Sequence, residues 1–417
     1  MQKKDRETPR NFGRFARRVL ETMKKVIIIG VGLGEGTMTR DAREAISQAE
    51  VLIGAPGLPE LCQGSDKRIY RGYMPEDVAS IIAEEDAQKF AVLVSGDVGF
   101  YSAASGMTGV LGDYDLRLIP GISTVNAFFA KLKQPWQEAV FVSVHGRKMN
   151  IIDTVRRNRM TFCLTGNNIS EIGAAMSKAG FGHIKTHIGE NLDSDQERVY
   201  EMTAGDLAVV EFPPLTVLLF VNEEFDDRTS CGLPDAGFSR AVGIPMTKSE
   251  TRAIIMSRLN LSSDAVCWDV GAGTGSVAVE MALCAYRGHV YAVENREEAI
   301  SLIEQNCASF HLGNVTAVCG EAPAALETLP VPDAVFIGGS GGELYGIIAA
   351  VLHKNWNARI VVTAVTVETV SAALNAFLSA GLEPDIAQIS VARGKQAGKL
   401  HLMEAQNPVT ILSGRND

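Results

Sequence analysis

The stretch from Val266 to Gly275 constrains the fold of this chain more than any other. It reads Val-Cys-Trp-Asp-Val-Gly-Ala-Gly-Thr-Gly, a short apolar run followed by alternating glycines. The run predicts a buried parallel strand over 266–270, and the glycines predict a tight turn after it. Residues 276–283 have a helical pattern. Strand, glycine turn and helix in this order predict a nucleotide-binding α/β domain.

The glycine spacing separates two kinds of nucleotide-binding domain. A dinucleotide fingerprint requires glycine or alanine at the position that Ser276 occupies. Here the glycines alternate, and Asp269 stands just before them. This pattern resembles the first motif of the class I S-adenosylmethionine (SAM) methyltransferases and disfavours an NAD fold. The resemblance implies a SAM site that includes Asp269, Gly271, Ala272, Gly273, Thr274 and Gly275.

Three further predicted strands end in turns that would line the same crevice. The first, 289–293, ends at Glu294, whose carboxylate suits a ribose diol, with an ordinary strand-end charge as the alternative. The second, 315–318, leads to Gly320, Glu321 and Ala322, and the last two are counted with the SAM site. The third, 333–337, leads to five residues predicted to border the substrate: Gly338, Gly339, Ser340, Gly341 and Gly342.

The N-terminal half repeats the period of strand, glycine turn and helix. Its predicted strands are 25–29, 51–54, 90–94, 116–119, 139–144, 161–164 and 216–221. The first strand enters a glycine-rich loop, 30–36, that lacks the Gly-Lys-Ser/Thr of an ATP loop. Glu35 stands where the third glycine of a dinucleotide loop belongs. This half is therefore also α/β, with a ligand crevice of its own.

Between the halves, residues 223–243 are acidic and rich in glycine and proline, and they predict a linker. We expect one domain over 24–222 and another over 244–417. Thr247 is a candidate SAM residue, with a capping box formed with Glu250 as the alternative. Towards the C-terminus, 359–365, 371–380 and 385–391 supply further strand and helix, and 400–404 with 408–412 predict a closing strand pair.

Composition narrows the function classes. The net charge of −10 gives no support for a nucleic-acid partner. Seven cysteines without a Cys-x-x-Cys pair indicate a reducing, cytoplasmic compartment and no metal site. No apolar run approaches the roughly 18 residues that span a membrane. Residues 1–23 form a basic extension that we expect to be disordered, with Met23 as an alternative start.

Together these motifs resemble the methyltransferases of cobalamin biosynthesis. The C-terminal motifs resemble the C15-methyltransferase and decarboxylase domain: Asp269 to Gly275, Val293-Glu294, Gly320 to Pro323, Phe336 to Gly342 and Pro245 to Lys248. The N-terminal motifs resemble a C5-methyltransferase of the tetrapyrrole methylase family: Gly30 to Gly34, Ser95 to Asp97, Pro120 to Ser123 and His145 to Arg147. Val98, where many tetrapyrrole methylases carry proline, and Glu321, where many class I enzymes carry aspartate, depart from the patterns.

The resemblance implies a fold and an activity. The fold is a two-lobed tetrapyrrole methylase domain followed by a Rossmann-like class I domain, with one SAM in each. The activity is methylation of precorrin-6Y, or its cobalt form, at C5 and C15, with loss of CO2 from the C12 acetate. Such methyl transfer depends on alignment and a dry site rather than on a strong base. No catalytic residue is therefore assigned.

In the N-terminal domain, the resemblance implies that SAM is held by Gly30, Asp97, Pro120, Gly121 and Ser123. Asp97 has turn capping as its alternative role. His145 and Arg147 are expected to contact carboxylates of the ring, although His145 has an ordinary strand-end role as its alternative.

We also expect the chain to form a homo-oligomer, so a second copy of the chain is a further partner beside the tetrapyrrole substrate. Alternative functions are SAM-dependent methylation of another tetrapyrrole, of RNA or of protein, and a non-enzymatic SAM-binding protein. Whether the substrate carries cobalt stays open.

Overall fold

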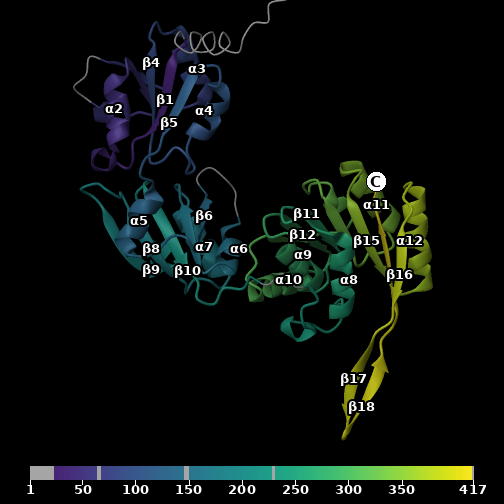
Figure 1. Cartoon of the computed structure of the whole chain (residues 1–417). Coiled ribbons are helices and arrows are strands. Elements are labelled where there is room, and N and C mark those ends of the chain that lie inside the picture. The colour runs from purple at the N-terminus through teal and green to yellow at the C-terminus, as the bar shows by residue number, and fades with distance from the viewer. Residues whose placement is uncertain (1–22, 63–66, 145–149, 228–230, 416–417) are drawn as a thin grey trace, which may run out of the picture. The chain divides into compact units, whose positions relative to one another are not determined.

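The computed structural model describes residues 23–62, 67–144, 150–227 and 231–415, and the predicted extension lies outside these ranges except for Met23 (Figure 1). Contacts between residues group the chain into two compact units. The first runs to Glu138 and includes His187–Tyr200 and Phe212–Leu218. The second comprises Ala139–Thr186, Glu201–Glu211 and Leu219–Asp417. No helix in the described ranges has the length and apolar character needed to cross a bilayer.

The first unit is built on a five-stranded sheet of order β3-β2-β4-β1-β5 whose neighbouring strands are all parallel. Its strands are β1 (Lys25–Gly30), β2 (Val51–Gly54), β3 (Arg68–Arg71), β4 (Lys89–Val94) and β5 (Asp115–Ile119). Successive side chains of β1 point to opposite faces. Val26 and Ile28 therefore pack with one hydrophobic cluster, and Ile29 packs with another. The cover is formed by α2 (Arg40–Gln48), α3 (Pro75–Glu84) and α4 (Ala104–Val110). The unit also contains two short 3-10 helices, η1 (Glu35–Thr37) and η2 (Pro59–Cys62).

A second five-stranded sheet has the order β6-β7-β10-β8-β9. Its strands are β6 (Ala139–Ser143), β7 (Met160–Leu164), β8 (Lys185–Glu190), β9 (Arg198–Thr203) and β10 (Thr216–Val221). The nearby helices are α5 (Thr124–Leu132), α6 (Ile151–Arg157), α7 (Ile169–Lys178) and η3 (Asp206–Ala208). Strands β8 and β9 were not predicted. The reason is their polar sequences, Lys-Thr-His-Ile-Gly-Glu and Arg-Val-Tyr-Glu-Met-Thr, of which the latter remains largely exposed.

The C-terminal part of the second unit is a seven-stranded sheet of order β13-β12-β11-β14-β15-β19-β16. The first five strands are parallel, and β19 is antiparallel to both of its neighbours. The strands are β11 (Val266–Val270), β12 (His289–Glu294), β13 (Val315–Cys319), β14 (Ala334–Ile337), β15 (Arg359–Ala364), β16 (Asp385–Ile389) and β19 (Val409–Gly414). The helices are α8 (Ser249–Leu259), α9 (Ser276–Cys284), α10 (Glu297–Ser309), α11 (Leu344–Lys354) and α12 (Val367–Ser379), with η4 (Asp235–Gly237) and η5 (Ala324–Leu326).

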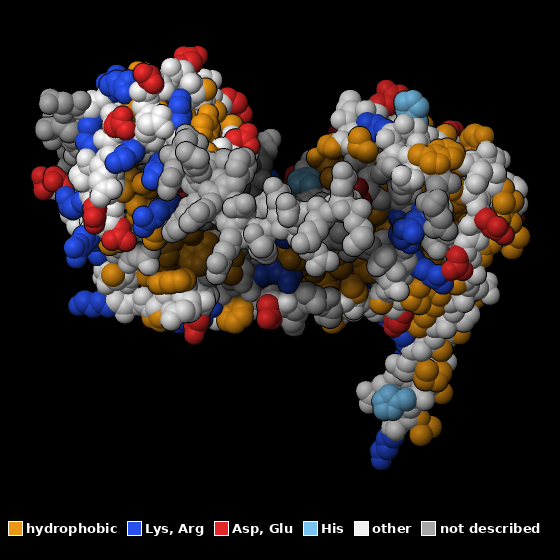
Figure 2. Space-filling model, turned by 45° about the horizontal axis from the view of Figure 1, so that its top comes forward, with side chains coloured by type: hydrophobic (Ala, Val, Ile, Leu, Met, Phe, Trp, Pro, Cys, Tyr) orange, Lys and Arg blue, Asp and Glu red, His pale blue; other side chains and the backbone are white. Residues whose placement is uncertain are grey.

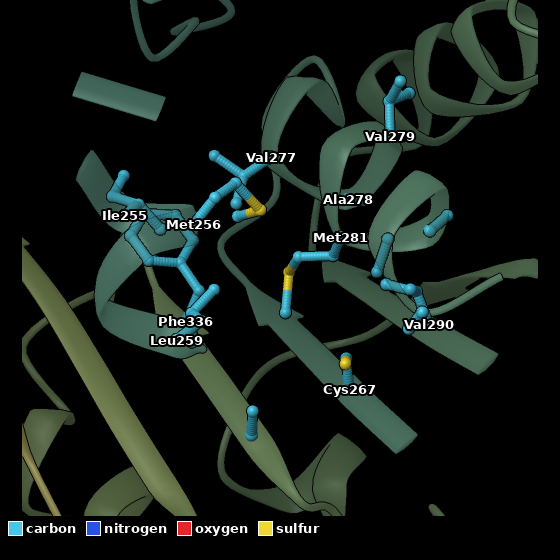
Figure 3. Packing of buried hydrophobic residues seen from close by; sticks show 14 of the residues in the cluster. Ile255, Met256, Leu259, Cys267, Val277, Ala278, Val279, Met281, Val290 and Phe336 are labelled. Carbon is cyan, nitrogen blue, oxygen red and sulfur yellow. The ribbon is translucent and has the colours of Figure 1, made fainter. Parts of the chain in front are cut away.

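Alternation along β11 divides the core of this sheet into two layers. Cys267 belongs to a cluster with residues of α8, α9 and α10, which Figure 3 shows from close by. Its neighbour Trp268 belongs to the opposite cluster, with residues of α11 and α12. Both side chains are fully buried. A sheet that is covered on both faces leaves only its strand ends accessible to a ligand.

The expected closing pair of 400–404 with 408–412 is wrong. Residues Leu400–Ala405 form β18, which pairs antiparallel with β17 (Ala392–Ala397) in a separate hairpin. Strand β19 instead lies between β15 and β16. The polar sequence of β17, Ala-Arg-Gly-Lys-Gln-Ala, has no apolar alternation that would have indicated a strand. Figure 2 shows apolar side chains on this hairpin where it stands away from the sheet.

The segment before α8 is fastened to the C-terminal sheet domain by a buried ion network. Arg252 is fully buried, and its Nε lies 2.6 Å from Glu280 Oε1 while its Nη1 lies 2.9 Å from Asp235 Oδ1. The Glu280 carboxylate also accepts hydrogen bonds from the amides of Gly232, at 2.7 Å, and Leu233, at 3.0 Å. The C-terminal part of the predicted linker is therefore packed on α8 and α9, while the domain boundary itself stays a prediction.

The capping box expected for Thr247 and Glu250 is wrong. The helix begins at Ser249 with Lys248 as its N-cap residue, and no side chain caps it. The Glu250 carboxylate instead pairs with Arg393 of β17. The carbonyl of Thr247 accepts a hydrogen bond from Arg252. The Glu250 carboxylate and the Thr247 carbonyl therefore bond to arginines rather than to each other's amides at the start of α8.

Replacing Arg252 should strongly destabilise the C-terminal domain. Arg252→Ala leaves Glu280, which is almost fully buried, without its cation. Breaking a buried pair in this way costs about 3–5 kcal/mol. Arg258→Ala is the matched control, because Arg258 pairs with the exposed Asp385 and such pairs contribute about 0–1 kcal/mol. Urea unfolding followed by tryptophan fluorescence measures both, and equal losses for the two variants would contradict the network's importance.

Candidate functional site

A cavity of about 270 Å³ opens at the carboxyl ends of the central parallel strands. Strand β11 lies between β12 and β14 in the sheet, so the turns that follow these three strands meet at one edge. The loop after β13 and Pro245 complete the wall. The lining residues are Pro245, Val270, Gly271, Gly273, Val293, Glu294, Asn295, Arg296, Gly320, Glu321, Ala322, Gly338, Gly339, Ser340 and Gly341.

Two glycines let the backbone segments around the cavity approach one another. Gly271 has a φ of +72°, and a Cβ there would lie 2.6 Å from the amide nitrogen of Gly339. Gly273 has a φ of +55°, and a Cβ there would lie 2.6 Å from the carbonyl oxygen of Pro245. Both positions therefore require glycine on two counts, conformation and space. The alternating glycines bring the walls of the cavity together.

Glu294 ends β12 with its carboxylate at the cavity. Its Oε2 accepts a hydrogen bond from the amide of Gly273 at 3.0 Å. Its Oε1 accepts from the Arg296 side chain at 3.1 Å and from the amides of Asn295 and Arg296 at 3.2 and 3.3 Å. A carboxylate oxygen has two lone pairs, so Oε2 keeps one for a further donor. This geometry suits a hydroxyl group that enters the cavity.

Asp269 lies beneath this site and is fully buried. Neither of its carboxylate oxygens has a hydrogen-bond partner within the described residues, and the hydroxyl of the buried Thr274 likewise has none. Burial, with a smaller contribution from the nearby charge of Glu294, raises the pKa of Asp269 to about 7. Buried carboxylates are normally hydrogen-bonded, so an unpaired one beside the cavity is an unusual feature of this site.

The structure brings together nine of the residues predicted for the C-terminal site. They are Gly271, Gly273, Glu294, Glu321, Ala322, Gly338, Gly339, Ser340 and Gly341. The predicted Thr247, Asp269, Ala272, Thr274, Gly275 and Gly342 are not part of the lining. Six lining residues were not predicted: Pro245, Val270, Val293, Asn295, Arg296 and Gly320. A signal existed for Arg296, since a cation two residues beyond a strand-end acid lies at the same sheet edge.

In the first unit, three glycines meet at the ends of β1, β4 and β5. A Cβ at Gly30 would lie 2.6 Å from the carbonyl oxygen of Gly96 and 2.7 Å from the amide nitrogen of Gly121. The Asp97 carboxylate accepts hydrogen bonds from the amides of Gly99, at 2.8 Å, and Gly121, at 3.1 Å. Asp97 thus joins the two loops. This geometry matches the turn-capping alternative and leaves a role for Asp97 in SAM binding as a prediction.

Two other residues predicted for the N-terminal site, Pro120 and Ser123, lie between β5 and α5. Ser123 is the N-cap of α5, and its Oγ accepts from the amide of Asn126 at 3.3 Å. Pro120 is exposed in the turn between β5 and α5. His145 and Arg147 lie outside the described residues.

The buried carboxyl of Asp269 predicts a pH-dependent stability. Well below pH 3.8 the group is protonated in both the folded and the unfolded chain. Between its ordinary pKa of 3.8 and the folded value of about 7, only the unfolded chain releases the proton. The free energy of unfolding of the wild type should therefore fall, relative to Asp269→Asn, as the pH rises from 5 to 8. Urea titrations of both proteins at each pH test this, and a constant difference would contradict the raised pKa.

Comparison with known proteins gives two family matches in tandem. Residues 25–208 match the family of tetrapyrrole (corrin/porphyrin) methylases, and residues 241–416 match the precorrin methyltransferase domain. The expected order of a tetrapyrrole methylase domain and a Rossmann-like methyltransferase domain is thereby confirmed.

Relatives match both the C-terminal domain and the tandem arrangement. A probable cobalt-precorrin-6B C(15)-methyltransferase (decarboxylating) from Pyrobaculum calidifontis is 44% identical over 184 residues, which is 44% of this chain and 94% of the relative. A precorrin-6Y C(5,15)-methyltransferase [decarboxylating] from Sinorhizobium sp. is 28% identical over 92% of this chain and 94% of its own length. The solved precorrin-6Y C5,15-methyltransferase of Geobacter metallireducens is 37% identical, covering 45% of this chain and 97% of that one, with a TM-score of 0.43.

These matches cover the glycine turns, the strand-end acid and the cavity described above. The chain belongs to the precorrin methyltransferase family, as an enzyme with a tetrapyrrole methylase domain ahead of a decarboxylating C15-methyltransferase domain.

Proposed function

We propose that this enzyme methylates precorrin-6Y, or its cobalt form, at C5 and C15 and removes the carboxyl group of the C12 acetate. The cavity at the carboxyl ends of β11, β12 and β14 carries the proposal, because nine independently predicted residues meet there. The relative with both activities in its name aligns with 92% of the chain, which supports the same pair of steps.

The residues of the cavity fit SAM, which supplies a methyl group on an electrophilic sulfonium. Glu294 would accept a hydrogen bond from a ribose hydroxyl through the free lone pair of Oε2. The amide of Ala322 would donate to or border the adenine edge. Gly271 and Gly273 leave the cavity without side chains at its base. Asp269, buried below, would contribute negative charge in its ionised form, which favours a cationic ligand.

The reacting carbon of the ring is itself the nucleophile, so the protein's task is to align it and to exclude water. In the decarboxylation, the C–C bond to the carboxyl group breaks, and its electron pair enters the conjugated ring, which is later protonated. The chain then needs only to hold the acetate and the ring. A site built from glycines and one ribose-binding acid is consistent with a reaction in which the ring supplies the reactive groups and the protein only holds and aligns them.

A second SAM site is proposed in the tetrapyrrole methylase domain, giving one SAM per domain. Gly30, Asp97, Pro120, Gly121 and Ser123 would form it at the ends of β1, β4 and β5. The close approach of Gly30 to Gly121 brings these turns to one edge of a parallel sheet, where ligands of α/β domains bind. His145 and Arg147 remain the proposed contacts for ring carboxylates.

The hairpin β17–β18 supports the proposal of a homo-oligomer. Leu400, Leu402 and Met403 are 70%, 60% and 69% exposed. A lone two-stranded hairpin is marginally stable in water, and its open edges favour pairing with another chain. We propose that a second copy of this chain covers it. The cytoplasm stays the proposed location.

The loop from Gly338 to Gly342 is proposed to hold the ring beside the C-terminal SAM. Gly341 and Gly342 have φ values of +56° and +95°, and a Cβ at either would meet no atom within 4 Å. A Cβ at Gly339 would meet only Gly271 Cα, at 3.8 Å. The protein itself therefore has room for a side chain at Gly339. Such space, at the wall of the cavity, suits a large ligand.

The function is tested by mass spectrometry of the product. Full-length enzyme is incubated with precorrin-6Y and SAM that carries a deuterated methyl group. The product should gain two labelled methyl groups and lose one CO2. Turnover of a different tetrapyrrole instead, or double methylation without loss of CO2, would contradict the proposal.

Gly339→Val tests the proposed ring site. The Cβ of the new side chain would meet no atom of the chain closer than 3.8 Å, and we expect the branched group to project where the ring would lie. C15 methylation and decarboxylation should fall together by tenfold or more, while C5 methylation and S-adenosylhomocysteine binding persist. Gly109→Val is the control, since a Cβ there meets no atom within 4 Å and Gly109 lies on α4, away from the cavity lining. Full decarboxylation in Gly339→Val, or a loss of ligand affinity as large as the loss of activity, would contradict this role.

A further inference from the structure

Arg296 connects two walls of the C-terminal cavity. Its Nε donates to Glu294 Oε1 at 3.1 Å, and its Nη1 donates to the carbonyl oxygen of Gly243 at 2.9 Å. Arg296 also lines the cavity itself. The two hydrogen bonds come from two different nitrogens, Nε and Nη1, of one planar guanidinium group. One residue thereby fixes both the strand-end acid and the turn before Pro245.

The Glu294 carboxylate needs this cation to keep a single orientation. It is 7% exposed, and its negative charge lies near the buried Asp269. Arg296 forms its ion pair among the described residues. Because the bonds to Arg296 and to two amides all end on Oε1, they turn Oε2 towards Gly273 and the cavity. Without the guanidinium group, Oε1 would keep only the two backbone amides, at 3.2 and 3.3 Å, and the carboxylate would be held less firmly.

The turn held at Gly243 leads directly to Pro245 in the cavity wall. Gly243 has a φ of +84°, a left-handed conformation that favours glycine. The carbonyl of Pro245 accepts a hydrogen bond from the amide of Thr274 at 3.3 Å. The bond from Arg296 thus anchors the near end of a short span whose far end is anchored by Thr274. Loss of Arg296 releases one of these anchors.

We propose that Arg296 is a positioning residue that holds the Glu294 carboxylate and the turn from Gly243 to Pro245 in the arrangement that receives the ribose of the nucleoside ligand. This inference rests on the proposed SAM site. It assigns Arg296 a role through Glu294 rather than in the chemical step. A lysine would keep the charge but lacks the planar fork that reaches both acceptors.

The test is a double-mutant cycle on the full-length protein, with S-adenosylhomocysteine binding measured by calorimetry. Charge-assisted hydrogen bonds justify an expected loss of about tenfold or more for Glu294→Gln and about tenfold for Arg296→Gln at the C-terminal site. The double variant should bind no more than about twofold worse than Glu294→Gln alone. Arg296→Lys should not restore affinity. Additive losses, an unchanged Arg296→Gln or full rescue by lysine would overturn the positioning role.

A second ligand separates positioning from general destabilisation. The analogue of S-adenosylhomocysteine without its ribose 2′-hydroxyl should bind the wild type several-fold more weakly than the parent compound. In Arg296→Gln this difference should nearly vanish, because the acid no longer faces the ribose. An undiminished difference would overturn the proposal. Arg258→Gln is the matched control: Arg258 is 35% exposed against 40% for Arg296, and both form an ion pair.

The cycle also separates this inference from the function on which it rests. If Glu294→Gln leaves binding unchanged, the ribose role of Glu294 is wrong, and the positioning role fails with it. If Glu294→Gln weakens binding and Arg296→Gln does not, the SAM site stands and only the role of Arg296 is wrong.

Discussion

The contact of glycine backbone with glycine backbone at the strand ends is the constraint on which the C-terminal site depends. A Cβ at Gly271 would lie 2.6 Å from the Gly339 amide nitrogen, so any side chain there would force the turns after β11 and β14 apart. The cavity lies where these turns meet. The first unit uses the same device, because Gly30 and Gly121 approach each other equally closely at the ends of β1 and β5. In both places the parallel sheet fixes the positions of the strand ends, and the glycines let the turns after the strands approach one another.

A few long-range ion pairs hold the segments that lie outside the sheet of the C-terminal domain. Arg252 joins the segment at Asp235 to α9 through Glu280, and Arg393 joins the base of the β17–β18 hairpin to Asp235 and Glu250. Arg296 does the same for the turn at Gly243. These arginines are planar donors that each serve at least two acceptor groups, which gives them a geometric role beyond their charge. The walls of the cavity therefore depend on residues outside the glycine motifs.

Much of this architecture could be predicted from the sequence, because the information is local. Buried parallel strands appear as short apolar runs, and the turns after them appear as glycines, so β11, β12 and β14 were predicted correctly, and nine of the predicted site residues lie at the cavity. The capping box of Thr247 and the strand pair at 400–412 were wrong. Both depend on distant partners: Glu250 bonds to Arg393, 143 residues away, and β19 inserts between β15 and β16. No local pattern encodes such pairings, whereas Arg296 lies only two residues from Glu294 and was within reach.

We propose that one chain carries two methyl-transfer sites, each formed where glycine turns meet at the end of a parallel sheet. The most direct measurement is the number of S-adenosylhomocysteine molecules that bind each full-length chain, determined by isothermal titration calorimetry. We expect two molecules of S-adenosylhomocysteine to bind each chain. A stoichiometry of one would contradict this proposal, since one of the two strand-end edges would then hold no nucleoside ligand.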